Sequence, residues 1–415
     1  MFIRGIRVWR WVFGVGVLGA TATGNAFELK DLLAFGVGPI VARPHLTVSE
    51  QYDDNIFYQT AGSPQDDFIT VINPGINLRL GKGEARSTLE ATYNYSAFIY
   101  ADNPYVGETS THQVGLAAGW RGNKTQLGLI GSASWTDTIY GGYEAFILGT
   151  YGSNITLIKT NIAVPSQLRA SYTLAPSANY AFSDKYSSYL NATLNETDFK
   201  QAKTLYDVNS WRTTLGMNYS FRPKIGMLSE AFYGQDAVDP NSTNLVKYPH
   251  LETVGGFLGL RGDLTRKINA TLRGGYQESK QGNYSFGTPV GSVALNAQLS
   301  DRSNLTLTYS RSTSLAVSAN AAYVSDNVSA QFQRTFGNRR PWTFNLGTAY
   351  AVVDYQTGDL RNLKSEYLSA SASLSYAWKL WLRSSLGYQY QKTWNSGKTV
   401  DYDVNMVTLS LSIGY

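Results

Sequence analysis

Apolar and polar residues alternate along most of the chain after residue 43, and the last segment shows the pattern most clearly. From Asp403 to Tyr415 a polar row (Thr408, Ser410, Ser412, Gly414) opposes an apolar row of Val407, Leu409, Leu411, Ile413 and Tyr415. A period of two with one apolar face predicts a β-strand. In a soluble sheet such a face needs a core to cover it. In a membrane barrel it contacts lipid, and the polar face lines a closed lumen.

The same alternation recurs in other segments, for example 86–99, 211–221, 368–378 and 382–391. Two kinds of break separate these segments. Short polar breaks lie at 81–84, 121–124, 183–185, 222–224, 263–267, 300–302, 337–341 and near Lys379, and long ones at 59–66, 101–111, 137–166, 199–208, 236–249, 279–290, 315–321, 356–365 and 394–402. Short turns at one end and long loops at the other are typical of outer-membrane barrels. We predict an all-β, transmembrane, antiparallel up-and-down β-barrel of about 18 strands over residues 43–415.

Three segments fit this pattern less well. Residues 45–58 place Glu50 and Asp54 on the apolar side, so we expect a bulge or a shifted register there. Segments 226–235 and 315–335 have no clear apolar face. Elsewhere, aromatic residues gather at the ends of apolar rows, where an interfacial girdle is expected: Trp120, Trp135, Tyr180, Phe182, Phe221, Trp342 and Trp378.

The composition agrees with a membrane barrel. Only 16% of the 415 residues are charged, against roughly 25% in an average soluble domain. The absence of cysteine excludes disulfides and thiolate metal sites. Beyond the N-terminus, no apolar run approaches the roughly 20 residues of a membrane helix.

The N-terminus predicts export. Residues 1–26 combine a basic start (Arg4, Arg7, Arg10) with a short apolar run and small residues suited to cleavage after Ala22 or Ala26, which is typical of a signal peptide. An uncleaved membrane anchor is the alternative, but the run is short for one. Residues 27–42 are predicted to form a periplasmic lead-in. Removing residues 1–26 lowers the net charge from +5 to +2, which argues against a nucleic-acid partner.

A family resemblance lies in the first predicted hairpin. The run 43–57, Arg-Pro-His-Leu-Thr-Val-Ser-Glu-Gln-Tyr-Asp-Asp-Asn-Ile-Phe, and the run 67–76, with its Pro-Gly, resemble the opening of the outer-membrane β-barrel porin 2 family. The resemblance implies an outer-membrane barrel without catalytic residues. Because some members of that family accompany exopolysaccharide synthesis and export, it also implies a polysaccharide conduit with periplasmic export proteins as partners. The terminal aromatic strand resembles the signal recognised by the barrel-insertion machinery.

The inward rows are expected to select what passes. By alternation, few acids, such as Glu90, and six arginines face the lumen: Arg79, Arg86, Arg169, Arg212, Arg273 and Arg383. Guanidinium groups around a pore favour anions. The alternative is that they are ordinary solvated charges at strand ends. In the long loop 137–166, Tyr140, Tyr143 and Tyr151 are candidates for an inward constriction or a slide for sugar rings; an outward loop, or strands extending above the membrane, is the alternative.

Candidate metal and catalytic groups are weak. Asp53, Asp54 and Asn55 with Asp66 and Asp67 offer oxygen ligands for calcium but lack the spacing of a calcium loop, and such residues also favour turns. No catalytic spacing involves the three histidines, His45, His112 and His250. We therefore expect no metal, no cofactor and no enzymatic activity.

Three functions remain open. The first is a passive outer-membrane pore linked to polysaccharide export, the second a general or anion-selective diffusion porin, and the third a non-conducting structural or receptor-like barrel. Membrane lipid is the expected surrounding in all three cases.

Overall fold

The computed structural model describes residues 34–58, 64–80, 86–103, 109–148, 156–200, 206–222, 224–240, 249–316, 321–337, 341–357, 361–395 and 401–414. The strands in these ranges are β1 (Phe35–Val37), β2 (Ile40–Asp53), β3 (Asp67–Leu80), β4 (Ser87–Tyr100), β5 (Thr109–Arg121), β6 (Thr125–Leu148), β7 (Thr156–Ala181), β8 (Tyr186–Lys200), β9 (Tyr206–Arg222), β10 (Ile225–Pro240), β11 (Leu251–Asp263), β12 (Ile268–Gln281), β13 (Tyr284–Ser300), β14 (Ser303–Ala316), β15 (Ala321–Phe336), β16 (Trp342–Tyr355), β17 (Lys364–Lys379), β18 (Leu382–Asn395) and β19 (Tyr402–Ile413). Within them, no helix is long and apolar enough to cross a membrane.

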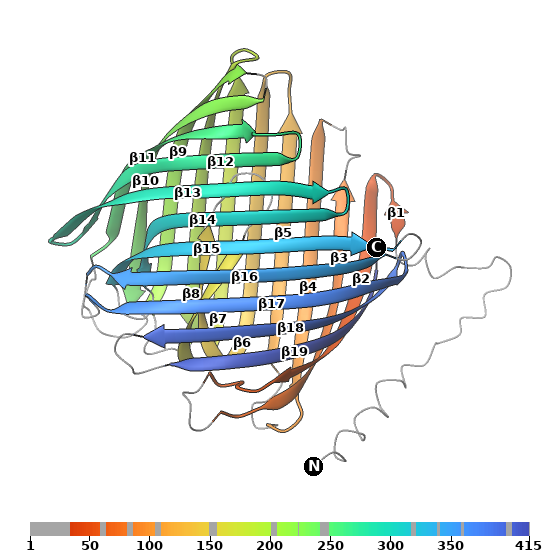
Figure 1. The fold of residues 1–415 in the computed structure, drawn as a ribbon. Coiled ribbons are helices and arrows are strands. Elements are labelled where there is room, and N and C mark those ends of the chain that lie inside the picture. Colours follow the sequence, from red (N-terminus) through yellow and green to blue (C-terminus); the bar gives the residue numbers. More distant parts are fainter. Residues whose placement is uncertain are drawn as a thin grey trace.

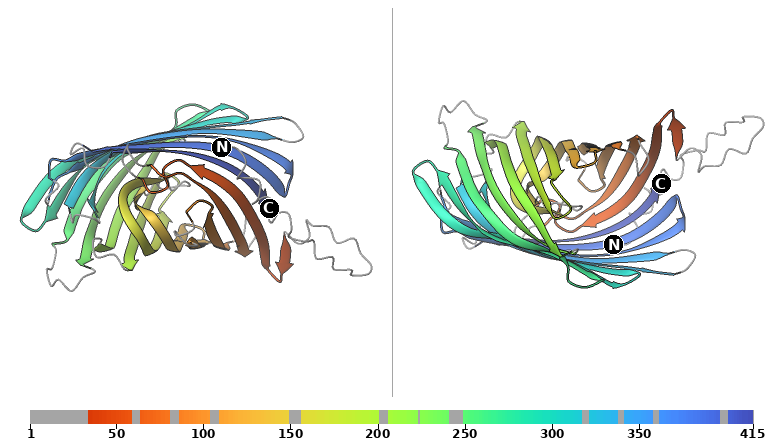
Figure 2. Two further views of the ribbon diagram at one scale, coloured as in Figure 1. Left: turned by 90° about the horizontal axis from the view of Figure 1, so that it is seen from below. Right: turned by 90° about the horizontal axis from the view of Figure 1, so that it is seen from above.

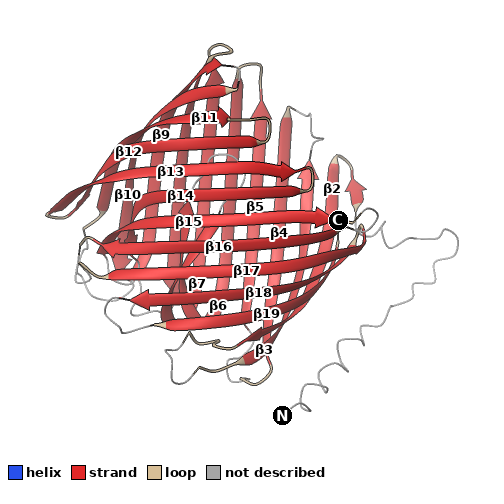
Figure 3. Cartoon of the chain, viewed as in Figure 1, coloured by secondary structure: helices blue, strands red, loops and turns tan. Residues whose placement is uncertain are grey.

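Strands β2 to β19 form one closed barrel. Each strand pairs antiparallel with the next along the chain, and β19 pairs with β2 to close the ring (Figures 1 and 3). The short strand β1 lies outside the ring and pairs with the start of β2 across a turn at Gly38, whose φ is 62°. The prediction of an antiparallel barrel with about 18 strands is confirmed.

The two ends of the barrel differ. At one end, here called the short-turn end, Gly122 donates to the carbonyl of Thr125 between β5 and β6, and Thr265 donates to Ile268 between β11 and β12. Strand β2 begins, and strand β19 finishes, at this end of the barrel. The opposite, long-loop end joins β2 to β3, β4 to β5 and the other alternate pairs.

Two predicted long loops are strand instead. Most of 137–166 extends β6 and β7, which pair as far as Leu148 and Thr156, and the end of this hairpin lies inside the barrel, between its two walls (Figure 2). Within 279–290, strands β12 and β13 continue to a tight turn at Gly282, whose φ is 59°. The polar residues of these segments resemble loops in the sequence, because a strand that does not contact lipid needs no apolar face.

The prediction of a bulge or a shifted register at residues 45–58 is also wrong. Strand β2 pairs with β3 without interruption from Ile40 to Asp53, and with β19 from Leu46 to Asp53. Glu50 therefore lies on the apolar row, where Thr70 on β3 donates a hydrogen bond of 2.9 Å to its carboxylate.

The concave face of the sheet is identified by contacts between strands that are not neighbours. Tyr189 on β8 donates to Glu230 on β10, and Glu230 pairs with Arg273 on β12. Side chains of strands two apart converge only on the inside of a curved sheet. The opposite face carries the exposed large apolar residues, such as Leu215 at 58% and Leu258 at 69% exposure. The predicted division into polar inner and apolar outer rows thus follows the register.

The barrel is flattened, and its wall turns sharply near β10–β13 (Figure 2). Glycines permit this turn, because the strands approach more closely than a side chain allows. A Cβ on Gly275 would overlap the carbonyl oxygen of Gly256, and one on Gly259 would overlap that of Leu272. We call this part of the wall the crease.

Candidate functional site

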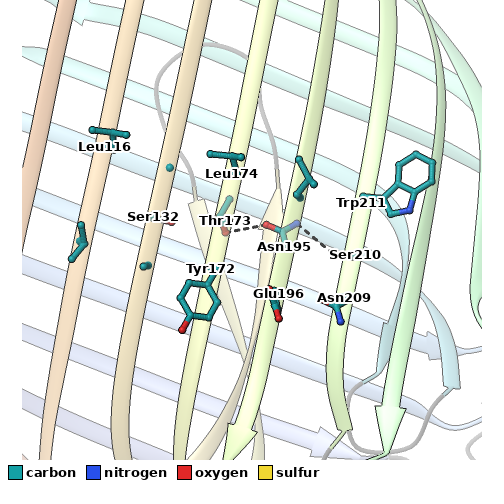
Figure 4. A pocket seen from close by; sticks show the side chains of 14 residues that line it. Leu116, Ser132, Tyr172, Thr173, Leu174, Asn195, Glu196, Asn209, Ser210 and Trp211 are labelled. Atoms are coloured by element: carbon teal, nitrogen blue, oxygen red, sulfur yellow. Dashed lines mark hydrogen bonds between the residues drawn. The ribbon is translucent and has the colours of Figure 1, made fainter.

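The inner face is a layer of short polar side chains joined across neighbouring strands. The hydroxyl groups of Thr47 and Ser412 lie 2.9 Å apart across the closing pair β2–β19. Asn195 accepts from Thr173 at 3.0 Å and donates to Ser210 at 3.4 Å (Figure 4). These bonds satisfy part of each group, and the remaining lone pairs and protons can bind water. The inner wall is therefore wettable.

The outer face of β5–β9 contrasts with this layer. A shallow, mainly apolar groove crosses it, and Leu116, Leu174 and Trp211 are among the residues that line it (Figure 4). The indole of Trp135 donates to the hydroxyl of Tyr172 at 3.2 Å near the end of the apolar band. The groove belongs to the apolar outer surface, so the solute site must lie on the inner face.

Several of the arginines predicted to line the lumen lie near the short-turn end. The register places Arg79 directly opposite Glu90, and both side chains are exposed. Arg86, just before β4, and Arg383, opposite Ser412 on β19, are exposed as well. These four groups are available to a solute at that end, and their role in selection stays a prediction.

The other three predicted arginines are less exposed. Arg169 on β7 pairs with Thr136 and Phe199. The guanidinium of Arg212 lies 4.9 Å from the ring centroid of Phe232 on β10, a cation–π contact. Arg273 lies 3.5 Å from Glu230, with side-chain exposures of 20% and 4% respectively. Arg212 and Arg273 thus have an aromatic and an acidic partner, respectively, on the wall itself.

Tyr189, Glu230 and Arg273 form a polar cluster on the inner wall beside the crease. The Tyr189 hydroxyl donates to Glu230, and the ring of Tyr189 crosses β9 at Gly216, where any Cβ would overlap it. Breaking a buried ion pair by removing one partner typically costs about 3–5 kcal/mol. The cluster thus fixes three strands relative to one another. The sequence analysis did not single out Glu230 and Tyr189. Alternation nevertheless places both on the inner row, which carries the odd-numbered residues of β8 and the even-numbered residues of β10.

At the long-loop end, the turn after β2 folds inward. Ile56 and Phe57 are buried against Ile69 on β3, and Val71, Phe98 and Tyr100 pack against this cluster. On the other side of the turn, Tyr58 packs edge-on against Tyr402 of β19 at 5.5 Å. Tyr58 has a φ of 51°, a left-handed conformation that costs a non-glycine residue energy. We call residues 54–58 the inward turn; it narrows the mouth beside β2, β3, β4 and β19.

The acids of the same region hold turns in place. Asp67 accepts from the backbone N–H groups of Ala101, Asp102 and Asn103 at 2.9–3.1 Å, and from the Asn103 amide at 2.9 Å. Asp54 accepts from the backbone and the side chain of Asn405, each at 2.7 Å. In the described ranges no group of three or more histidine, cysteine or acidic residues could hold a metal ion. The turn interpretation of these acids, rather than a calcium site, accounts for their contacts.

A second inward element narrows the mouth from the opposite side. Above Gly291, β13 and β14 no longer pair, although β14 and β15 continue together to Ala316 and Ala321. Their end packs Leu315 into a buried cluster with Val238 and Leu251, which lie on the inner face of β10 and β11. The β14–β15 end therefore leans beneath the neighbouring wall.

Hydrogen bonds hold the β14–β15 end in this position. The backbone of Ala322 donates to Thr357 at 2.7 Å, and the Thr357 hydroxyl donates to Gln281 at the end of β12. Thr357 and Gln281 are 1% and 3% exposed. Together with the inward turn, this end reduces the opening available to a solute.

The predicted aromatic constriction falls largely outside what can be described. Tyr151 lies outside the described residues, and Tyr140 and Tyr143 have described backbone only. Their strands belong to the part of the β6–β7 hairpin drawn between the two walls of the barrel (Figures 2 and 4). Their contact with a solute stays a prediction.

The histidines occupy three different environments. His45 lies on the inner face and bonds Asn94 at 2.8 Å through Nε2, whereas His112 lies on the outer face and bonds the Tyr93 hydroxyl at 3.0 Å through Nδ1. His250 precedes β11. Within the described ranges none of them bonds a serine or a carboxylate, so no triad is assembled there.

The chain was compared with known proteins. No family model matches it, and no curated protein does. Among solved structures it is similar to Pseudomonas aeruginosa OpdQ (11% identity, 90% of this chain and 98% of that chain, TM-score 0.45) and to P. aeruginosa OpdO (11%, 90% and 97%, TM-score 0.47). The siderophore receptor PirA from the same organism is similar as well (10%, 90% and 80%, TM-score 0.46). These values are too low to assign an activity, so the function must be argued from this chain.

Proposed function

We propose that this protein is a bacterial outer-membrane channel through which solutes diffuse passively. The observation that carries the proposal is the closed wall of β2–β19 with its large apolar side chains exposed on the convex face. A continuous apolar surface of this kind is unfavourable in water and favourable in lipid. Barrels of 16–18 strands usually leave an aqueous channel, and the polar inner layer suits one. Catalysis has no part in this function.

The solutes preferred by the channel are small anions. Besides the six predicted arginines, Arg121 and Arg261 lie on the inner rows, opposite Gln126 and Thr271. The acids on the same inner rows are fewer: Asp53, Asp67, Glu90, Glu230, Asp236 and Asp263. Cationic side chains along a pore lower the barrier for anions and raise it for cations.

The alternative to small anions is a secreted polysaccharide that passes through the channel. It is supported by the resemblance of residues 43–57 and 67–76 to the porin 2 family opening and by the tyrosines of the β6–β7 hairpin. Periplasmic export proteins would be its partners. The test is secretion: loss of this protein would stop polymer export while synthesis continues, and unchanged export would exclude the conduit.

The chain reaches the outer membrane by a signal peptide in residues 1–26 and by the barrel-insertion machinery, which recognises the terminal strand. Edman sequencing of the mature protein tests the first step, with cleavage after Ala22 or Ala26 expected. An N-terminus that still carries Arg4, Arg7 and Arg10 would contradict it.

Conductance of the purified protein in planar bilayers tests the channel. We expect discrete steps with chloride more permeant than potassium. Removing residues 142–162, the end of the β6–β7 hairpin, is expected to enlarge each step. Bilayers that stay closed would overturn the proposal in favour of a non-conducting barrel.

A further inference from the structure

The carboxylate of Glu50 faces outward beside large apolar side chains. Glu50 lies on the outer row of β2 between Val48 and Tyr52, and its paired neighbour on β19 is Leu409, which is 51% exposed. Within the described residues its carboxylate has one hydrogen-bond donor, Thr70, and no cation within 4 Å. An ionisable group facing lipid is costly and usually finds a partner.

An imidazole with a free nitrogen lies on the same outer face. His112 on β5 uses Nδ1 for the Tyr93 hydroxyl and packs against the ring of Tyr95 at 4.9 Å. In the described part of the chain its Nε2 has no hydrogen-bond partner, and the side chain is half-buried. It is therefore a potential donor to a carboxylate from outside the chain.

Glu50 and His112 lie at the same depth. The ladder of paired residues runs from Leu46, midway along β2, through His112 to Trp135 and Ala170, and it rises towards the long-loop end. From Glu50, crossing three strands along the ladder to β5 moves the position along the barrel axis by about 9 Å towards the long-loop end, for a strand tilt of roughly 40°. His112 lies four residues back along β5, which moves the position by about 10 Å in the opposite direction. The two groups are then about 19 Å apart along the wall.

The surface between them suits a twofold axis. Its midpoint falls at the pair Ile72–Ala97 on β3 and β4. Ala97 is small, and the surrounding outer residues Phe68, Ile72 and Ile99 are 37–49% exposed. Strands β2–β5 lie on a long side of the flattened outline (Figure 2), so two copies can meet there over several strands.

We propose that β2–β5 form the interface of a homodimer in the membrane, with Glu50 of each copy bound to His112 of the other. The twofold axis passes by Ala97. A twofold interface is self-complementary, so one carboxylate and one imidazole on the same face supply two equivalent contacts. The proposal rests on the membrane location proposed above.

Cysteine cross-linking in the intact membrane tests it, because the chain has no cysteine of its own. Oxidation is expected to link Ala97→Cys chains to one another. Glu50→Cys chains are expected to link to differently tagged His112→Cys chains, and neither to itself. Leu346→Cys on β16, also exposed on the outer face, is the control and should stay monomeric.

A charge exchange tests the pairing itself. Glu50→His and His112→Glu are each expected to reduce the cross-linked Ala97→Cys dimer at least tenfold, and the double exchange to restore it. Monomeric Ala97→Cys, linkage of Leu346→Cys to the same extent, or linkage of Ala97→Cys only to a different protein would overturn the proposal. Single-channel conductance of each variant, measured in parallel, shows separately whether the channel function holds.

Discussion

Replacing Gly216 by alanine tests the polar cluster beside the crease. A Cβ at this position would overlap the ring of Tyr189, so the ring must move away and release Glu230. A hydrogen bond to a charged group is worth about 1.5–3 kcal/mol. Glu230 keeps Arg273, but its side chain is only 4% exposed and cannot recover the lost donor from water easily. We expect Gly216→Ala to lower the free energy of unfolding by about 2–3 kcal/mol.

Gly387 on β18 provides the matched control. It also lies on the inner face, but a Cβ there would meet its nearest neighbours, the carbonyl oxygens of Thr408 and Ala372, at 3.9 and 4.0 Å, which is ordinary contact. Alanine in a strand is favoured over glycine by roughly 0.5–1 kcal/mol, so Gly387→Ala should be neutral or stabilising. Urea unfolding of both variants in lipid vesicles, followed by tryptophan fluorescence, measures the difference. Equal stabilities of the two variants would refute the role of the cluster.

Three further changes follow from the mouth and the lumen. Phe57→Ala removes a buried ring of the inward turn; it should cost about 3 kcal/mol and enlarge single-channel conductance, and unchanged conductance would mean that the turn does not narrow the pore. Asp67→Ala leaves backbone N–H groups after β4 without their acceptor and should lower the free energy of unfolding in urea by about 2 kcal/mol; an unchanged free energy of unfolding would contradict this. Changing Arg79 and Arg383 to glutamine should lower the chloride-to-potassium permeability ratio about twofold, unlike Arg334→Gln on the outer row; equal ratios would exclude selection by these arginines.

The barrel could be predicted from the sequence because successive residues of a strand face lipid and water in turn, so that the two environments appear as alternating apolar and polar residues. The prediction failed where the environment departs from lipid outside and water inside. In β10 the inner row contains Leu228 and Phe232, which are 3% and 4% exposed. At the crease the inner face is packed rather than wet, so both rows are partly apolar and segment 226–235 was ambiguous. The first residues of β15, where Tyr323 and Val324 are both buried, were ambiguous because they too are packed on both faces.

The candidate site was less predictable than the fold. Alternation gives the face of Arg273, but its partner Glu230 lies two strands away, and such a contact depends on the curvature of the wall. The packing of the inward turn and the shift of the β14–β15 end depend in the same way on contacts distant in sequence. The outward Glu50 illustrates the opposite error, since a bulge was expected where the chain keeps its register.

Labelling of single cysteines along β19 tests the two-faced wall most directly. Thr408 and Ser410 lie on the inner row, and Leu409 and Leu411 on the outer row. In vesicles, a water-soluble maleimide should react with Thr408→Cys and Ser410→Cys and spare Leu409→Cys and Leu411→Cys. Equal labelling of all four, or labelling of the outer pair alone, would contradict a water-filled barrel in lipid.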